Sequence, residues 1–265
     1  MQAASRESYY AARAALGSPS IEAGEQILAF ADLLAREPRL RRALADPSRK
    51  GDERAELARN LLAGKVSDAA IGPIGALAAG RWSAPSELLE ATERLGVDAL
   101  LAAAQSSGDL VEAEDELFRF GQIVSGDPKL TAVVGDSSVD PARRVVVVRE
   151  LLEGKTKPVT VKLAELAVRG FGGRNFAAGL TRLVELVAER REAEIAFVTV
   201  AEPIDEASEN RLASSLANIY GRQVSLKIIV NPAVLGGMSV RVGSDLYDGT
   251  VARRLADVRN ALASR

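Results

Sequence analysis

Residues 193–201 read Ala-Glu-Ile-Ala-Phe-Val-Thr-Val-Ala, and this stretch separates two regions of different periodicity. β-Branched and aromatic residues dominate it, which is typical of a β-strand whose alternate side chains face opposite sides. Before it, apolar residues recur at helical spacing, and after it they continue to alternate. We therefore expect a mainly α protein that ends in a small α+β domain over residues 193–265.

The residues after this first strand predict the order strand–helix–strand–strand–helix. Pro203 stops the first strand, and Asp205 is a suitable N-cap for a helix that ends at Tyr220. The second strand is expected at residues 224–230, the third follows a pair of glycines, and the final helix covers residues 250–263.

The helical region contains an internal repeat at an offset of about 90 residues. Glu37-Pro38-Arg39-Leu40 aligns without a gap on Asp127-Pro128-Lys129-Leu130. Paired leucines and single glycines further along the chain align in the same register. Matches that keep proline, glycine and paired leucine at one fixed offset predict two tandem helical-bundle domains. We name residues 1–92 copy one and residues 93–192 copy two.

Each copy is predicted to fold as a helical bundle. In copy one, apolar residues from Ile27 to Leu34 recur at helical spacing, and Pro38 ends that helix. Gly64 is placed to end a later helix as a left-handed C-cap. One long helix is expected to close copy one and open copy two without a break. The later predicted helices cover residues 52–62, 68–79, 85–104 and, closing copy two, 175–191.

The composition excludes most kinds of active site. The chain has no cysteine and no histidine, which removes thiolate nucleophiles, the usual neutral general base and the commonest metal ligands. The net charge of −2 gives no electrostatic reason to expect nucleic acid as a partner. We therefore expect no catalytic site, no cofactor and no metal.

Two stretches that look like ligand sites have simpler interpretations. Residues 170–175 are rich in glycine, but no strand precedes them, so a helix–helix connection is favoured over a phosphate-binding loop. The acidic residues Glu112, Glu114, Asp115 and Glu116 lie near the start of a helix, where negative charge suits the helix dipole. A metal site there is the less favoured interpretation.

No targeting segment stands out at the start of the chain, which lacks the apolar core of a signal peptide. The apolar runs are far shorter than the roughly 18–20 residues that cross a bilayer. The sequence therefore predicts a soluble, cytoplasmic protein whose membrane association comes through a partner.

Residues 230–244 carry the most specific pattern in the chain. An apolar strand is followed by Asn231, a turn, Gly236-Gly237 and a second alternating strand that contains Arg241. This run resembles the signature of the F-type ATP synthase delta family, which includes the mitochondrial oligomycin-sensitivity-conferring protein. Residues 10–16 look like the opening helix of the same family.

The resemblance implies a non-catalytic peripheral stator subunit that resists rotor torque during proton-driven ATP synthesis. In the family, the helical domain grips the N-terminal helices of the alpha subunits, and the C-terminal domain grips the b-type peripheral stalk. The implied location is the cytoplasmic face of the bacterial plasma membrane, reached through the complex. The family pattern has one helical domain before the C-terminal one, whereas this chain has two.

The resemblance also supplies the candidate residues for partner contact, which lie in the C-terminal domain and in the opening helix. They are Asn231, Leu235, Gly236, Gly237, Val240, Arg241, Gly243, Asp248, Gly249, Val251, Leu255, Val258, Tyr10 and Ala14.

Several of these residues have a structural interpretation beside the functional one. The glycine pair either gives the backbone conformation that enters a strand or leaves room for a partner helix. Asp248-Gly249 is either a turn and helix cap or a ligand site. The final helix either covers the strands or receives a helix of another chain through the stripe Val251, Leu255, Val258 and Leu262.

Two other functions stay open from the residues alone. One is a helical adaptor with unrelated partners. The other is an enzyme that uses carboxylates such as Asp245 and Asp248 beside the glycine-rich turn.

Overall fold

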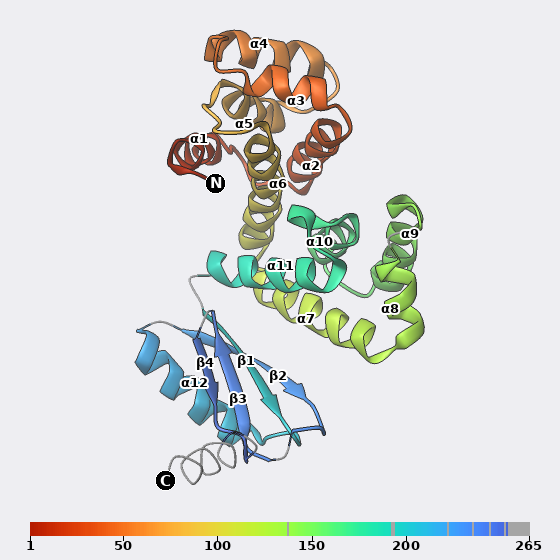
Figure 1. Cartoon of the computed structure of the whole chain (residues 1–265), viewed down its shortest axis with the longest axis vertical. Helices are drawn as coiled ribbons and strands as arrows, with labels where there is room; N and C mark the ends of the chain where they lie inside the picture. The colour runs from red at the N-terminus through yellow and green to blue at the C-terminus, as the bar shows by residue number, and fades with distance from the viewer. Residues whose placement is uncertain are drawn as a thin grey trace, which may run out of the picture. The chain divides into compact units, whose positions relative to one another are not determined.

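The computed structural model divides the chain into two compact units, Met1–Leu183 and Val184–Arg265 (Figure 1). The first unit is helical and the second contains a small sheet, which confirms the predicted fold class. The expected domain boundaries at residues 92 and 192 stay predictions. The structure describes residues 1–136, 138–191, 194–221, 223–234, 236–243, 245–251 and 253.

Short turns join the helices of the first unit into one succession. Copy one contains α1 (Ala3–Ala14), α2 (Ile21–Arg36), α3 (Pro38–Ala45), α4 (Gly51–Leu62) and α5 (Asp68–Ala79). The long helix α6 (Pro85–Ser107) then continues from copy one into copy two, as predicted. Copy two continues with α7 (Leu110–Gly126), α8 (Pro128–Gly135), α9 (Pro141–Leu152), α10 (Pro158–Arg169), the 3₁₀ turn η1 (Phe171–Gly173) and α11 (Phe176–Arg190), which crosses the unit boundary.

The sequence did not predict the short helices α3 and α8. Pro38 does end α2, but it is also the first residue of α3. Proline suits this position because its fixed φ is helical and the missing N–H has no partner in the first turn. The same holds for Pro128 at the start of α8, where the Asp127 carboxylate also accepts from two backbone N–H groups.

Equivalent positions of the two copies make equivalent local contacts. Asp46 accepts hydrogen bonds from the N–H and hydroxyl of Ser48 at 2.9 and 2.7 Å. Asp136 accepts the same pair from Ser138 at 2.9 and 2.6 Å. The boundaries of α3, α4 and α5 also recur in α8, α9 and α10 at the offset of the repeat.

A second pair of contacts recurs between distant helices. The side chain of Gln26 on α2 accepts from the backbone N–H of Ser67 at 2.8 Å. At the matching positions of copy two, Glu116 accepts from the N–H of Lys157 at 2.9 Å. Each contact ties the second helix of a copy to the start of its fifth.

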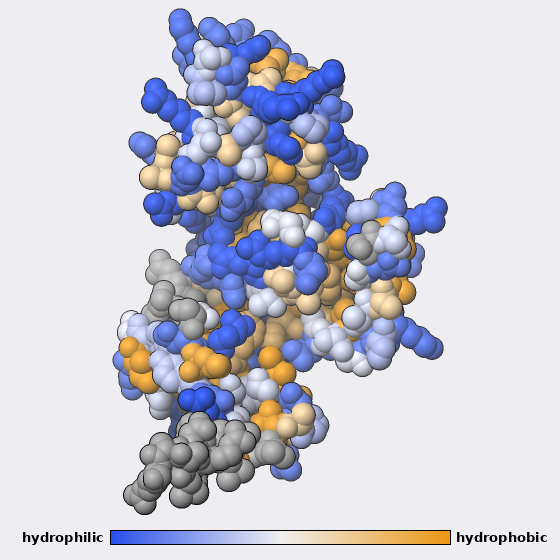
Figure 2. Space-filling model, in the orientation of Figure 1, coloured by the Kyte–Doolittle hydropathy of each residue, from blue (hydrophilic) through white to orange (hydrophobic). Residues whose placement is uncertain are grey.

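The visible surface of the first unit is mostly hydrophilic, and hydrophobic residues appear on the lobe that carries α8 and α9 (Figure 2). Ion pairs link α2 of copy one to α10 of copy two: Lys162 lies 2.5 Å from Glu25, and Arg169 lies 2.7 Å from Asp32. Because these side chains are partly exposed, each pair contributes only about 0–1 kcal/mol. Apolar packing therefore carries most of the stability.

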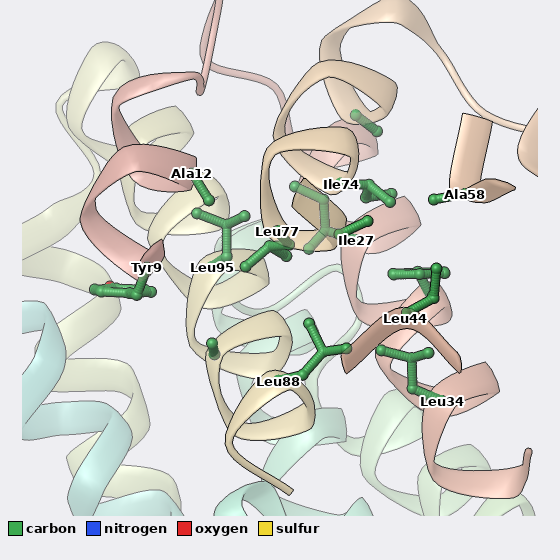
Figure 3. Packing of buried hydrophobic residues seen from close by; sticks show 14 of the residues in the cluster. Tyr9, Ala12, Ile27, Leu34, Leu44, Ala58, Ile74, Leu77, Leu88 and Leu95 are labelled. Atoms are coloured by element: carbon green, nitrogen blue, oxygen red, sulfur yellow. The ribbon is translucent and has the colours of Figure 1, made fainter. Parts of the chain in front are cut away.

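The core of copy one lies between α2, α5 and α6. Ile27, Ile74 and Leu77 are fully buried and lie close together in Figure 3. Burying each such side chain contributes about 1.5–3 kcal/mol. Close approach of α2 and α6 requires a glycine at 24, because a Cβ there would lie 2.8 Å from the Leu100 side chain.

The second unit is a sheet with strand order β2-β1-β3-β4. The strands are β1 (Glu194–Val200), β2 (Val224–Val230), β3 (Met238–Val242) and β4 (Asp245–Asp248). β1 is parallel to β2 and antiparallel to β3, and β3 is antiparallel to β4. The helix α12 (Glu206–Tyr220) connects β1 to β2 and begins at the predicted N-cap, where Asp205 accepts from the N–H of Ser208 at 2.9 Å.

One face of this sheet forms the apolar core of the second unit. Ala196, Val198 and Val200 are buried together with Leu216 of α12, which confirms the predicted alternation of β1. The predicted three-stranded order is wrong in one respect, because β4 pairs with the edge of β3. Aspartates at both ends of β4 disfavour a strand in sequence terms, and cross-strand pairing overrides them. Residues 252 and 254–263 of the predicted final helix lie outside the described residues.

Candidate functional site

The turn after β2 is held by Asn231. Its backbone N–H donates to the carbonyl of Val200 at 2.8 Å, and its side-chain oxygen accepts from the N–H of Ala233 at 3.0 Å. An asparagine that accepts from a backbone N–H two residues ahead stabilises a turn. The role of Asn231 in the structure is therefore to fix the path between β2 and β3.

Gly236 and Gly237 both adopt positive φ, at 74° and 78°. A Cβ on Gly237 would lie 2.5 Å from the carbonyl oxygen of Gly249, so no larger residue fits there. The N–H of Gly249 donates to Met238 at 3.0 Å, and that of Val251 donates to Gly236 at 3.2 Å. The glycine pair thus meets a backbone requirement, namely positive φ and close contact with the segment after β4.

Asp248 caps the segment that follows β4. Its carboxylate accepts from the N–H and the hydroxyl of Thr250 at 3.1 and 2.7 Å. The hydrogen bond from the Thr250 side chain is the main cause that lowers the pKa of Asp248 below its usual value. Asp248 and Gly249 therefore act as a turn and cap, which is the structural alternative that the sequence left open.

Val240 and Arg241 lie on opposite faces of β3. Val240 is buried in the core, whereas Arg241 is exposed and its guanidinium lies 4.6 Å from the centre of the Phe197 ring. A cation in this position is attracted by the face of the aromatic ring. Gly243 has φ of 55° in the turn between β3 and β4. Of these residues, only Arg241 presents a functional group to solvent.

Tyr10 and Ala14 lie one turn apart on the exposed side of α1, and Tyr10 is 59% exposed. Its neighbour Tyr9 faces inward and donates a hydrogen bond to the buried carboxylate of Asp98. Arg13 also lies 3.5 Å from Asp98. These contacts fix α1 against α6, while the Tyr10 ring packs beside that of Tyr9, with 5.4 Å between the ring centres, and stays exposed.

The remaining candidates, Leu235, Leu255 and Val258, lie outside the described residues, as does Leu262 of the proposed stripe. Val251 is described and is 41% exposed.

The structure adds a cluster that the sequence did not reveal. The hydroxyl of Tyr220, at the end of α12, lies 3.0 Å from both the Asp245 carboxylate and the Tyr247 hydroxyl. Beside it, Leu246 is 65% exposed. The pairing of β4 with β3 brings these residues together, so the local sequence does not predict the cluster. Asp245 and Asp248 accept from different side chains, Tyr220 and Thr250 respectively.

The glycine-rich connection of copy two binds a carboxylate of its own chain. The N–H of Gly172 donates to Glu93 at 3.0 Å, and burial raises the pKa of Glu93. This confirms a helix–helix connection at residues 170–175. Within the described part of the chain, no cluster of three or more acidic side chains is arranged to hold a metal, and no helix is long and apolar enough to cross a bilayer.

Comparison with known proteins gives a consistent result. The family model described as "ATP synthase delta (OSCP) subunit" matches residues 97–262. "ATP synthase subunit delta" of Salinispora arenicola is 57% identical over all of this chain and all of the relative. The protein of the same name from Streptomyces griseus is 41% identical, covering 99% of this chain and 100% of the relative.

A chain in the cryo-EM structure of the Toxoplasma gondii mitochondrial ATP synthase hexamer is 18% identical, with a TM-score of 0.40. The match covers 63% of this chain and 94% of that one. The family match and the two full-length relatives suffice: the chain belongs to the ATP synthase delta (OSCP) subunit family.

Proposed function

We propose that this chain joins the catalytic head of an F-type ATP synthase to its peripheral stalk and resists the torque of the rotor. Within the family it is a peripheral stator subunit that works in ATP synthesis and has no active site of its own. The observation that carries the proposal is the family match over residues 97–262, which includes most of copy two and the α+β unit.

The partners that we propose are the N-terminal helices of the alpha subunits for the helical region and the b-type subunit for the α+β unit. Both contacts require a groove or face that receives an amphipathic helix, with polar residues fixing its register. Exposed apolar side chains support the binding of such a helix by the α+β unit, where Ile219 and Leu246 are both about two-thirds exposed. Such a joint needs slow dissociation and no chemistry.

The start of the family match at residue 97 also favours an assignment of the two copies. We propose that copy two is the counterpart of the single helical domain in the family and that copy one adds a further contact area. If both copies engage linked partners, the second contact becomes intramolecular, and avidity rises by roughly 10²-fold or more.

The place that fits this role is the cytoplasmic face of the plasma membrane, where the chain is held by the rest of the complex. A helical adaptor with unrelated partners is not favoured, because the full-length relatives are ATP synthase subunits.

Gentle purification of the tagged chain from solubilised membranes of its own cells tests the proposal. Mass spectrometry should find alpha, beta and b-type subunits in stoichiometric amounts. A chain that purifies alone or with other proteins would contradict it.

A further inference from the structure

The third and fourth helices of each copy have the same fold and different surfaces. In copy two, α8 and α9 border a shallow, open groove of about 270 Å³, lined by Ala132, Val133, Val139, Arg143 and Val147 together with Asp136 and Arg144. We name this the α8–α9 groove. It is smaller than the roughly 300–1,000 Å³ of small-molecule pockets, so it suits inserted side chains better than a free ligand.

At two of its lining positions the α8–α9 groove is apolar where copy one is charged. Ala132 stands where copy one has Arg42, and Val139 stands where it has Arg49. On α9, one turn after the lining residue Arg143, Val146 takes the place of Glu56. The boundaries of α8 and α9 match those of α3 and α4, so these substitutions leave the extent of the helices unchanged.

The apolar side chains at the groove are exposed to an unusual degree. Val133, in the groove lining, is 47% exposed, and Val146, on α9, is 51% exposed. Single exposed apolar residues are ordinary, but a group of them around a concave surface indicates an interaction site.

The charges at the groove indicate what kind of partner it fits. The Arg144 guanidinium donates to the carbonyls of Val134 and Val139, and Asp136 accepts from Ser138. Among the described residues, Arg143 is the lining charge with no such contact. An apolar groove with one available cation at its rim is complementary to an apolar stripe that carries an acidic residue.

We infer that the α8–α9 groove of copy two binds an amphipathic helix from the catalytic head, with an acidic side chain of that helix facing Arg143. The inference rests on the proposed function and adds to it the place of contact and the charge of the partner. Helix-in-groove binding of this kind uses apolar anchors for affinity and the ion pair for register.

A variant that gives copy two the surface of copy one tests the inference. The substitutions Ala132→Arg, Val139→Arg and Val146→Glu introduce residues that this chain already carries at the equivalent positions, so the helices should fold. The probe is the purified catalytic head prepared without this chain, and binding is measured by surface plasmon resonance. We expect affinity to fall at least tenfold, with the circular dichroism spectrum unchanged.

Arg143→Glu should weaken binding more than Arg143→Gln, because it replaces attraction by repulsion. Val111→Glu is the matched control, since Val111 is also about half exposed but lies on α7, outside the groove lining. If the wild-type chain binds the head and the triple variant binds equally well, the groove inference is wrong while the proposed function stands. If the wild-type chain does not bind the head, the proposed function itself fails.

The absence of cysteine allows a direct identification of the occupant. Val133→Cys, labelled with a benzophenone maleimide, carries one photo-cross-linker at the groove. A cross-link to an acidic amphipathic segment of the head supports the inference. A cross-link to a second copy of this chain, to the stalk, or to nothing overturns it.

Discussion

Copy one and copy two have the same succession of helices and differ where those helices face solvent. Gln26 and Glu116 make equivalent contacts, and Asp46 and Asp136 cap equivalent turns. At two lining positions of the α8–α9 groove, by contrast, Ala132 and Val139 stand where copy one has Arg42 and Arg49. The residues at turns and helix caps stabilise the same fold in both copies. The solvent-exposed residues of the helices can differ between the copies without changing that fold.

The largest expected difference between the copies concerns a buried arginine. Arg54 is 3% exposed and donates to the carbonyls of Asp46, Ala78, Ala79 and Gly80. Its counterpart Arg144 donates to two carbonyls. Hydrogen bonds to charged groups contribute roughly 1.5–3 kcal/mol each, but the bonds of one side chain do not add. Arg54→Ala should therefore destabilise by about 3–5 kcal/mol, and Arg144→Ala, at a side chain that is only partly buried, by about 1.5–3 kcal/mol.

Urea unfolding followed by circular dichroism measures both variants. Equal decreases in the free energy of unfolding would contradict the prediction, because they would show that the additional hydrogen bonds of Arg54 do not add stability.

A smaller effect should be the same in both copies. Gly64 and Gly154 have φ of 70° and 74°, and a Cβ at either position would meet no atom within 4 Å. Alanine would therefore meet no steric clash, and its only penalty is the left-handed backbone conformation, which costs about 1–2 kcal/mol for a residue with a Cβ. Gly64→Ala and Gly154→Ala should therefore lower the free energy of unfolding by similar amounts. A loss confined to one variant would mean that the turns are not equivalent.

The smallest expected effect is a pH dependence that belongs to copy two. Burial raises the pKa of Glu93, and copy one has Ala3 at the matching position. Because the folded pKa lies above the unfolded value of about 4.5, the protonated group stabilises the fold below that pH. The contribution is lost as pH rises through the folded pKa.

Glu93→Gln should remove this part of the pH dependence, since its amide oxygen still accepts from Gly172. Thermal unfolding between pH 4 and 7 checks it, and identical pH profiles of the two proteins would contradict the assignment.

Local patterns predicted much of the fold. The alternation of β1, the N-cap Asp205 and the unbroken helix α6 follow from short-range chemistry that the structure retains. The short helices α3 and α8 were missed because a proline that ends one helix also begins the next. The strand β4 was missed because its stability comes from pairing with β3, which no local composition reveals.

The sequence predicted one part of the candidate site, the turn after β2, and did not predict the surfaces formed by separate segments. The turn from Asn231 to Gly237 has a recognisable sequence, and its glycines meet a backbone requirement that the sequence anticipated. Surfaces made from separate segments were not predictable, because they depend on tertiary packing. The cluster at Tyr220 joins a helix end to an edge strand, and the α8–α9 groove lies between two helices.

The most direct test of the stator role is coupling between the head and proton movement. Inverted membrane vesicles from cells that lack this chain should hydrolyse ATP without ATP-driven proton uptake, and addition of the purified chain should restore uptake. Vesicles that pump protons equally well without the chain would contradict the account.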